Sequence, residues 1–154
     1  MSWPRVTKPG STCDSFVNLV DFMPSFLDIA GVERPEGVDG RSIVPLLRGS
    51  VPDDWPDDVY GEFHGYEATL ASIRMVRTRR WKYVYNPTSI DELYDMESDP
   101  GELHNLAGML GYGHVLRRMK ARMVKWLRTT NDGIIAEGSW QSNSYDLYIS
   151  GRER

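Results

Sequence analysis

Apolar and polar residues alternate along the middle of the chain in the pattern of β-strands. The clearest run is Trp81-Lys82-Tyr83-Val84-Tyr85-Asn86, in which aromatic residues occupy every second position. A period of two places such residues on one face of a sheet. Shorter runs of the same kind lie on both sides of this one. The pattern predicts a small four-stranded antiparallel sheet with strands at residues 59–63, 72–78, 81–86 and 93–96.

After the strands the period changes to that of an α-helix. Between residues 112 and 129, apolar residues recur three or four positions apart, and basic residues fill most of the other positions. Such an amphipathic helix must bury its apolar stripe, and the apolar face of the sheet is the partner that the chain offers. We therefore expect an α+β fold in which the sheet packs against this C-terminal helix through Val115, Leu116, Met119, Met123, Trp126 and Leu127.

Two short helices are predicted before the sheet. Asp21 is a good N-cap, and Pro24 then falls at the third helical position, where its missing N–H leaves no intrahelical hydrogen bond unmade. Gly31 suits the end of this helix, because a residue with left-handed backbone angles commonly stands there. Ser42 and Gly49 predict the start and the end of the second helix in the same way.

Length and charge narrow the class of protein. The 154 residues are typical of about one domain, and the net charge of −4 and the pI of 5.4 give no electrostatic reason to expect a nucleic acid partner. The sequence contains no apolar run of 18 residues, so no membrane-spanning helix is expected. A single cysteine, Cys13, excludes an internal disulfide and leaves the compartment undecided.

One stretch of the chain carries a family signature. Residues 91–106 read Asp-Glu-Leu-Tyr-Asp-Met-Glu-Ser-Asp-Pro-Gly-Glu-Leu-His-Asn-Leu, which resembles the C-terminal signature block of the sulfatases in the alkaline-phosphatase superfamily. Residues 20–31, 39–49 and 77–84 resemble three further sulfatase motifs, in the same order. Each motif alone is weak, but four in the right order are specific, and the resemblance extends over roughly residues 3–107.

This resemblance implies how the chain is divided. Residues 1–50 would be the incomplete C-terminal edge of the large α/β sulfatase domain, so that the two short helices belong to that domain. Residues 51–130 would be the C-terminal sulfatase subdomain, and residues 131–154 a tail. Residues 50–58, which are rich in Pro and Asp, agree with a boundary between two structural units.

The resemblance also implies a function. It suggests a C-terminal fragment of a sulfuric ester hydrolase that supports the catalytic domain and is inactive alone. In an intact sulfatase, hydrolysis uses a formylglycine nucleophile and a calcium-type cation. The related phosphodiesterases and phosphonate hydrolases share this C-terminal architecture and are an alternative. A non-catalytic module that binds a carbohydrate or a protein is an alternative of a different class.

The sequence lacks the motifs that carry the nucleophile and the metal ligands of a sulfatase. Cys13 is followed by Asp14-Ser15-Phe16-Val17, which does not match the sulfatase nucleophile motif Cys/Ser-x-Pro-x-Arg. The acidic pairs in residues 53–58 lie in a Pro-rich linker, and the histidines share no ligand spacing. Asn131-Asp132 follows the end of the predicted helix and is better explained as a C-cap than as a metal-binding pair. We therefore predict no catalytic residue, no metal ligand and no cofactor in this chain, although calcium is expected in an intact family member.

His64 and Arg77 are the two candidates for residues at the rim of a substrate site. His64 is predicted at a strand-to-loop junction, and Arg77 belongs to a basic cluster whose guanidinium groups would suit sulfate. The alternative for His64 is a surface histidine or a local hydrogen bond. The alternative for the basic cluster is charge that keeps the strands soluble, with Arg74 and Lys82 on a polar sheet face and Arg79 and Arg80 at a hairpin turn. Arg77 and Lys82 are expected to pair with Glu92, Asp95 or Glu102. The residues predicted to fix the fold are Asp21, Pro24, Gly31, Lys82, Tyr94, Asp95, Asp99, Pro100, Glu102 and Asn105.

The short helices also predict a partner. In a full sulfatase their apolar residues would face the large domain, so in this chain they would be partly exposed unless they pack elsewhere. We expect either the missing N-terminal sulfatase domain or self-association through an apolar patch. The residues concerned are Phe22, Phe26, Leu27, Ile43, Leu46 and Leu47.

Overall fold

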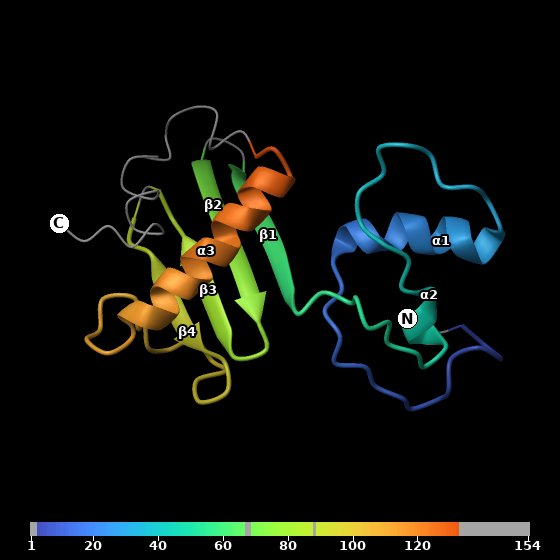
Figure 1. Ribbon diagram of the computed structural model, residues 1–154, viewed down its shortest axis with the longest axis horizontal. Helices are drawn as coiled ribbons and strands as arrows, with labels where there is room; N and C mark the ends of the chain where they lie inside the picture. The colour runs from blue at the N-terminus through green and yellow to red at the C-terminus, as the bar shows by residue number, and fades with distance from the viewer. Residues whose placement is uncertain (1–2, 67–68, 88, 133–154) are drawn as a thin grey trace. The chain divides into compact units, whose positions relative to one another are not determined.

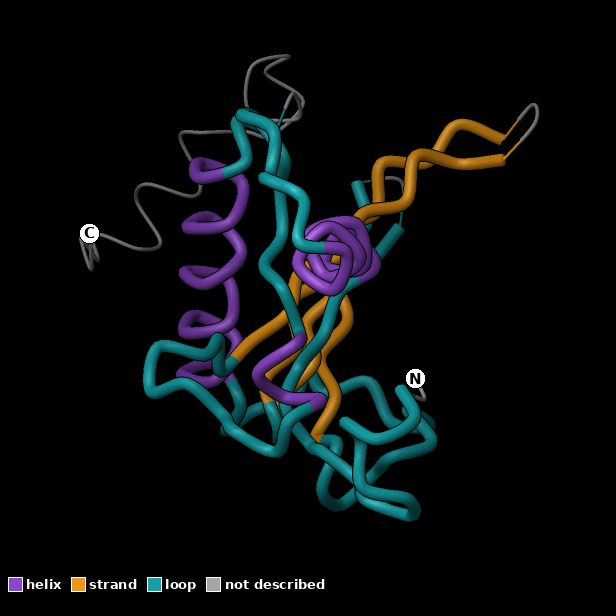
Figure 2. The backbone as a smooth tube through the Cα atoms, turned by 90° about the vertical axis from the view of Figure 1, so that its right-hand side faces the viewer, coloured by secondary structure: helices purple, strands orange, loops and turns teal. Residues whose placement is uncertain are grey.

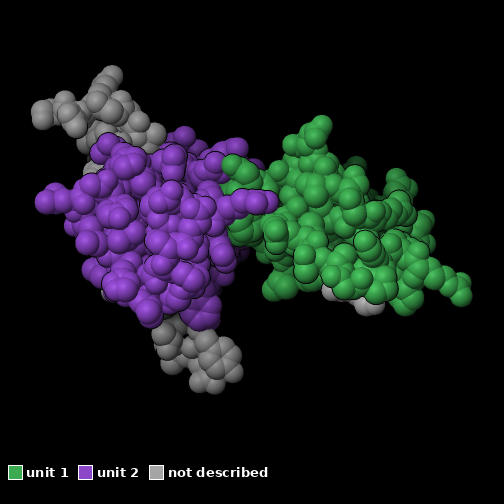
Figure 3. Space-filling model, turned by 90° about the horizontal axis from the view of Figure 1, so that it is seen from below, with its two compact units in different colours: residues 1–59 green, residues 60–154 purple. Residues whose placement is uncertain are grey.

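The chain divides into two compact units. The computed structural model describes residues 3–66, 69–87 and 89–132 (Figure 1). The units are Met1–Val59 and Tyr60–Arg154, which Figure 3 distinguishes by colour. The sequence analysis placed a boundary within residues 50–58. The predicted tail lies outside the described residues from residue 133 on.

The second unit is a four-stranded sheet with a helix across one face, as predicted (Figure 1). Its strands lie side by side in chain order, and β2–β3 and β3–β4 pair antiparallel. Short turns suffice to connect such neighbours. The elements are β1 (Asp58–Tyr66), β2 (Thr69–Thr78), β3 (Trp81–Tyr85), β4 (Glu92–Asp95) and α3 (Gly113–Thr129).

The core of this unit lies between the sheet and α3. The register places Val76 opposite Tyr83 and Tyr83 opposite Leu93, so three completely buried side chains form a row across β2, β3 and β4. The apolar stripe of α3 covers this row, which is why the period of two and the period of 3.6 predicted the same interface. The buried cluster consists of Tyr60, Val76, Trp81, Tyr83, Leu93, Val115, Met119, Met123, Val124 and Leu127.

The first hairpin differs from its prediction. Strands β1 and β2 are longer than the ranges 59–63 and 72–78, and their far ends run as a two-stranded ribbon beyond the other strands (Figure 2). His64 therefore lies within β1, and its prediction at a strand-to-loop junction was wrong. Arg74, predicted on a polar sheet face, is 2% exposed. Arg74 has the parity of Val76, which is completely buried, so a period of two agrees with burial, and the charge of Arg74 was what misled the prediction.

The end of α3 is closed by its own backbone. Asn131 has a left-handed φ of 51°, and its N–H donates to the carbonyl of Arg128. The N–H of Asp132 donates to the carbonyl of Leu127, 2.9 Å away. These two bonds form a Schellman motif, which satisfies carbonyls that the helix end leaves open. The prediction of a C-cap at Asn131-Asp132 is confirmed, and the motif turns the Asp132 side chain into a buried position.

The first unit contains short elements joined by loops. They are η1 (Leu19–Asp21), α1 (Phe22–Ala30) and α2 (Val44–Leu47). Asp21 stands at the N-cap position of α1, but its side chain makes no cap hydrogen bond to α1. Its carboxylate instead accepts the N–H of Asn18 at 2.7 Å and that of Arg41 at 2.9 Å. Pro24 is the third residue of α1, and Gly31 follows the helix with a left-handed φ of 66°, both as predicted.

Serine side chains connect the two helices of this unit. The Ser25 hydroxyl donates to the carbonyl of Asp21 and accepts the N–H of Ile43 at 2.9 Å. Ser42 was predicted to cap α2. Ile43 holds the N-cap position, but the Ser42 hydroxyl accepts the N–H of Val44, the first residue of α2, at 3.2 Å, and donates to Asp28 at 2.6 Å. The helices are thus held by a few polar contacts, since buried hydroxyl groups need partners.

Much of the apolar surface of the first unit is exposed. Leu19 is 79% exposed, Met23 51% and Phe26 56%. Of the side chains predicted to face another domain, Ile43 is buried, Phe26 is exposed, and the remaining members of that set, Phe22, Leu27, Leu46 and Leu47, are half-buried. Among the described residues, no helix has the length and the apolar character needed to cross a bilayer.

Candidate functional site

Asp99 organises the turn of the signature block. The turn runs from Asp99 to Glu102 with Pro100 at its second position, where the fixed φ of proline suits a β-turn. The two carboxylate oxygens of Asp99 accept the N–H groups of Leu103 at 3.1 Å and His104 at 2.8 Å. These backbone hydrogen bonds lower the pKa of Asp99. The carboxylate therefore fixes the chain direction after the turn.

Asn105 joins the same block to β4. Its amide oxygen accepts the N–H of Leu93 at 3.1 Å and that of Ala107 at 2.9 Å. Its amide nitrogen donates to the carbonyl of Asp91 at 3.0 Å. One side chain thus satisfies backbone groups that the end of a short edge strand would leave open. The spacing between Asp91 and Asn105 in the signature follows from this geometry.

Charged pairs hold the block against the sheet. Lys82 Nζ lies 2.6 Å from a carboxylate oxygen of Glu102, which is the pairing expected from the sequence. Asp95 pairs with Arg80 at 2.9 Å. Arg77 was expected to pair in this region, but Nε of Arg77 has no partner among the residues that the structure describes. The hydrogen bond from Arg80, reinforced by a backbone N–H, lowers the pKa of Asp95. The sequence prediction had assigned Arg80 only to a solvated hairpin turn.

Tyr94 completes the block on the face of the sheet that does not carry α3. Its hydroxyl donates to Glu92 at 2.9 Å, and its side chain is largely buried. Burial, followed by the hydrogen bond to Glu92, raises the pKa of Tyr94 to about 12. The hydroxyl is therefore a proton donor in a fixed bond at neutral pH, which suits a structural role.

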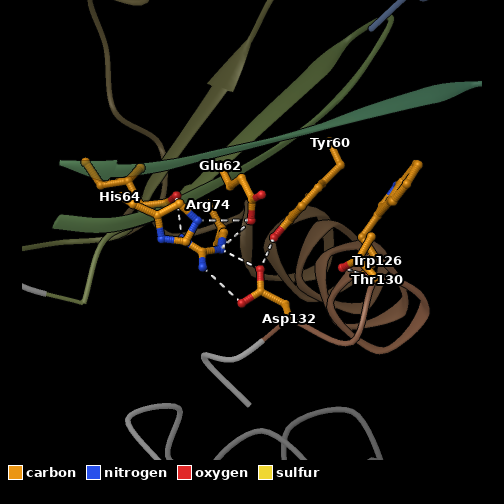
Figure 4. Close-up of polar contacts among 8 residues, drawn as sticks. Tyr60, Glu62, His64, Arg74, Trp126, Thr130 and Asp132 are labelled. Carbon is orange, nitrogen blue, oxygen red and sulfur yellow. Dashed lines mark hydrogen bonds and ion pairs between the residues drawn. The ribbon is translucent and has the colours of Figure 1, made fainter. Parts of the chain in front are cut away.

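A second polar cluster lies where α3 ends over β1 and β2 (Figure 4). Arg74 forms a two-pronged contact with Asp132, with Nε at 2.7 Å and a terminal nitrogen at 2.9 Å. The hydroxyl of Tyr60 donates to the same carboxylate at 2.7 Å, and the Tyr60 ring stacks on Trp126. Two strands and the helix end are thereby joined by a single carboxylate.

Burial and charge act together in this cluster. Burial, reinforced by the hydrogen bond to Asp132, raises the pKa of Tyr60 far above its usual range. Burial opposes the positive charge of Arg74, but its hydrogen bond to Asp132 and the charge of that carboxylate outweigh burial and raise the pKa of the guanidinium. Arg74 and Tyr60 therefore stay protonated, and neither is suited to act as a general base.

His64 lies at the open end of this cluster. Its Nε2 is 3.4 Å from a carboxylate oxygen of Glu62, which in turn is 3.7 Å from Nε of Arg74. The His64 side chain is 64% exposed, whereas that of Arg74 is 2% exposed. The buried Arg74 and the neighbouring Glu62 can hold the His64 imidazole in position for contact with a ligand. This arrangement does not by itself form a nucleophile–base pair.

The structure does not bring the two rim candidates together. Along β1, His64 has the same parity as Tyr60 and so lies on the sheet face that carries α3. Arg77 follows Val76, which is completely buried against α3, and so lies on the other face. Nε of Arg77 is buried, and no partner for it lies within the described part of the chain. His64 and Arg77 would therefore meet two different ligands or surfaces.

The acidic, histidine and cysteine side chains of the described residues do not gather into a metal site. Within residues 3–66, 69–87 and 89–132, no group of three His, Cys, Asp or Glu side chains is placed to hold a metal ion. Cys13 is exposed. The described residues therefore do not fit the calcium site that the resemblance implies for an intact family member.

Comparison with known proteins assigns a family to this architecture. Residues 1–129 match the family model described as N-sulphoglucosamine sulphohydrolase, C-terminal. The chain is 32% identical to an ulvan-active sulfatase from Formosa agariphila, over 84% of this chain and 32% of that protein.

Solved structures show the same fold. The structure described as BT4656 in complex with its substrate D-glucosamine-2-N, 6-O-disulfate shares 31% identity and a TM-score of 0.77, over 84% of this chain and 28% of that one. Phosphonate monoester hydrolase SpPMH from Silicibacter pomeroyi shares 27% identity and a TM-score of 0.70, over 80% of this chain and 27% of that one. The chain thus spans a third or less of each of these proteins.

Proposed function

This chain belongs to the family of N-sulphoglucosamine sulphohydrolase C-terminal domains, and on that premise we propose that it is the supporting C-terminal part of a sulfuric ester hydrolase and is inactive alone. The observation that carries the proposal is the signature block. Asp99, Asn105 and the Lys82–Glu102 pair all stabilise backbone or pair with one another, and none is poised for catalysis. Nucleophile and cation would then be supplied by the larger domain.

An aryl sulfate assay tests this function. The 154-residue chain is incubated with 4-nitrophenyl sulfate, with and without added Ca²⁺, and release of 4-nitrophenol is followed by absorbance. We expect no turnover above the buffer blank under either condition. Turnover that depends on the cation would overturn the proposal, because it would require a nucleophile and a metal site within this chain.

The partner proposed for the first unit is the larger sulfatase domain. Leu19, Met23 and Phe26 are exposed along η1 and α1, and an apolar patch of this kind is costly to leave in water. Size-exclusion chromatography with light scattering over a range of concentrations tests the competing proposal of self-association. A monomer at all concentrations favours the domain partner, and a concentration-dependent dimer favours self-association.

The rim role of His64 and Arg77 is a separate proposal. Exposure of the His64 imidazole, and its support by Glu62 and Arg74, favour contact with a sugar hydroxyl or sulfate. Arg77 has a buried nitrogen without an acceptor in the described part, which favours an acceptor supplied from outside it. In an intact hydrolase carrying this domain, His64→Ala is expected to raise KM with little change in kcat. An unchanged KM would contradict the rim role.

A phosphonate monoester hydrolase is the second candidate within enzymes. The likeness to the Silicibacter pomeroyi enzyme favours it, at 27% identity. The intact hydrolase would be compared on an aryl sulfate and on a phenyl phosphonate monoester. Higher kcat/KM for the sulfate supports the leading proposal, and higher kcat/KM for the phosphonate supports the alternative. A non-catalytic module is supported if neither ester is hydrolysed and a carbohydrate or protein still binds.

A further inference from the structure

The outer face of α3 carries a strong concentration of positive charge. The helix contains Arg117, Arg118, Lys120, Arg122, Lys125 and Arg128, and it contains no Asp or Glu. At about 100° per residue, Arg117, Arg118, Lys125 and Arg128 fall within one arc of about 100°, opposite the buried stripe. All four are exposed. We call these four residues the cationic face of α3.

Three cations of this face, Arg117, Arg118 and Lys125, differ from four other cations of the second unit. Lys82, Arg74, Arg80 and Lys120 each have a carboxylate within 2.9 Å. Among the described residues, no carboxylate lies within 4.0 Å of Arg117, Arg118 or Lys125. The whole chain has a net charge of −4, so this face is a local reversal of the overall sign. Like charges along one helix face repel one another, a cost that a bound anion would relieve.

The residue types indicate which anion suits this face. Guanidinium groups match the oxygens of sulfate with two parallel hydrogen bonds, and several cations in a row favour a polymer over a single small anion. We propose that the cationic face of α3 binds a sulfated polysaccharide and holds the polymer substrate of the hydrolase. This inference rests on the proposed function, and it adds that the substrate is a polymer chain and not a free monosaccharide.

Nucleic acid is the competing polyanion. Single strands are usually bound by cations together with exposed aromatic rings. Trp126, the aromatic residue of α3, is half-buried and stacks on Tyr60 with ring centroids 5.6 Å apart. Since the cationic face lacks a ring on which a base could stack, a polymer bound through its sulfates fits it better.

A binding titration with matched variants tests the inference. Heparin is titrated into the full chain at low and at moderate salt, and the heat of binding is measured. The test variant is Arg117→Gln, Arg118→Gln, Lys125→Gln, in which Gln keeps the helix propensity close to that of Arg and Lys. The control variant is Arg5→Gln, Lys8→Gln, Arg79→Gln, which removes the same charge from exposed positions elsewhere. We expect about a tenfold loss of affinity in the test variant and a much smaller loss in the control.

Four outcomes would overturn the inference. They are no binding of heparin by the unmodified chain at low salt, an equal loss in both variants, equal binding of unsulfated polygalacturonate, and equal or tighter binding of duplex DNA. Circular dichroism confirms that each variant folds, and single substitutions at Arg117 and Lys125 replace the triple variant if it does not. Heparin binding requires no turnover, so its failure is distinguishable from failure of the aryl sulfate test.

Discussion

The two units of this chain are stabilised in different ways. The second unit has a contiguous apolar core in which Tyr83, Leu93 and Met119 are completely sequestered from solvent. The first unit buries Ile43 and Val44, but Leu19 and Phe26 remain exposed. Hydrophobic burial is the dominant favourable term in folding, so the second unit has the stronger internal basis for stability.

The difference shows which parts of the fold are self-contained. In the first unit the elements are connected through Asp21 and Ser25, which bind backbone groups across the loop that precedes α2. Such polar contacts specify a conformation but add little net stability each. The first unit therefore leaves apolar side chains uncovered, whereas residues 60–132 contain the core that holds the signature block.

The largest expected effect comes from the buried charge of the second unit. Asp132→Ala removes the carboxylate that binds both Arg74 and Tyr60. Among the described residues, it leaves the buried guanidinium with only its longer carboxylate contact, to Glu62 at 3.7 Å. We expect a loss of about 3–5 kcal/mol in the free energy of unfolding, measured by urea denaturation. Asp53→Ala, at an exposed position, is the control. Equal stability of the two variants would contradict the role of Asp132.

A cavity in the core is expected to have the next largest effect. Leu127 is completely buried between α3 and the sheet, so Leu127→Ala should cost about 2–5 kcal/mol in urea denaturation. Leu110, which is 100% exposed, is the matched control, and its replacement by Ala should change stability by about 0.5 kcal/mol or less. Similar losses at the two positions would remove the contrast between core and surface.

Two glycines test the first unit by itself. Gly40 has a φ of +79°, and a Cβ there would lie 2.5 Å from the carbonyl oxygen of Val20. Gly31 has a φ of +66° with open space around it. We expect Gly31→Ala to cost about 1 kcal/mol from backbone strain and Gly40→Ala about 2–3 kcal/mol, because the backbone must also move. The NMR signal of the Trp55 indole N–H, which donates to the carbonyl of Phe16 at 2.9 Å, can follow this unit by itself. Equal effects of the two substitutions would contradict the close approach at Gly40.

The smallest effect concerns acid pH. The pKa of Asp95 is lowered in the fold, so its contribution to stability is complete above the unfolded pKa of about 4 and is lost as the pH falls through the folded value. Below pH 4 the unmodified chain should therefore lose stability more steeply than Asp95→Asn. Thermal melts at several pH values measure this slope. Parallel curves for the two proteins would show that the Arg80–Asp95 pair contributes nothing measurable.

The sequence predicted the fold where one periodicity dominated. Simple periods relate Trp81 to Tyr83 and the residues of the apolar stripe of α3 to one another. The predictions of β3, of α3 and of the interface between them were therefore correct. The hairpin of β1 and β2 was shortened, because residues 64–72 mix Gly, polar and aromatic residues without a clear alternation. The length of a strand pair in that region depends on pairing between its strands, which a local pattern does not encode.

The polar clusters were predicted less completely. The pair of Lys82 and Glu102 followed from the family motif. Which arginine pairs with Asp95, Arg80 or Arg77, depends on the side of the hairpin from which each guanidinium group extends. Arg74 and Asp132 are 58 residues apart, and their contact exists only because the end of α3 lies over β2. The shared parity of Arg74 and the apolar Val76 was the one available signal.

Hydrogen–deuterium exchange of the isolated 154-residue chain tests the central claim most directly, namely that residues 60–132 fold on their own core while the first unit needs an external surface. The account predicts slow exchange in β3 and α3 and much faster exchange in α1. Equal protection of α1 and α3 in the monomeric chain would contradict it.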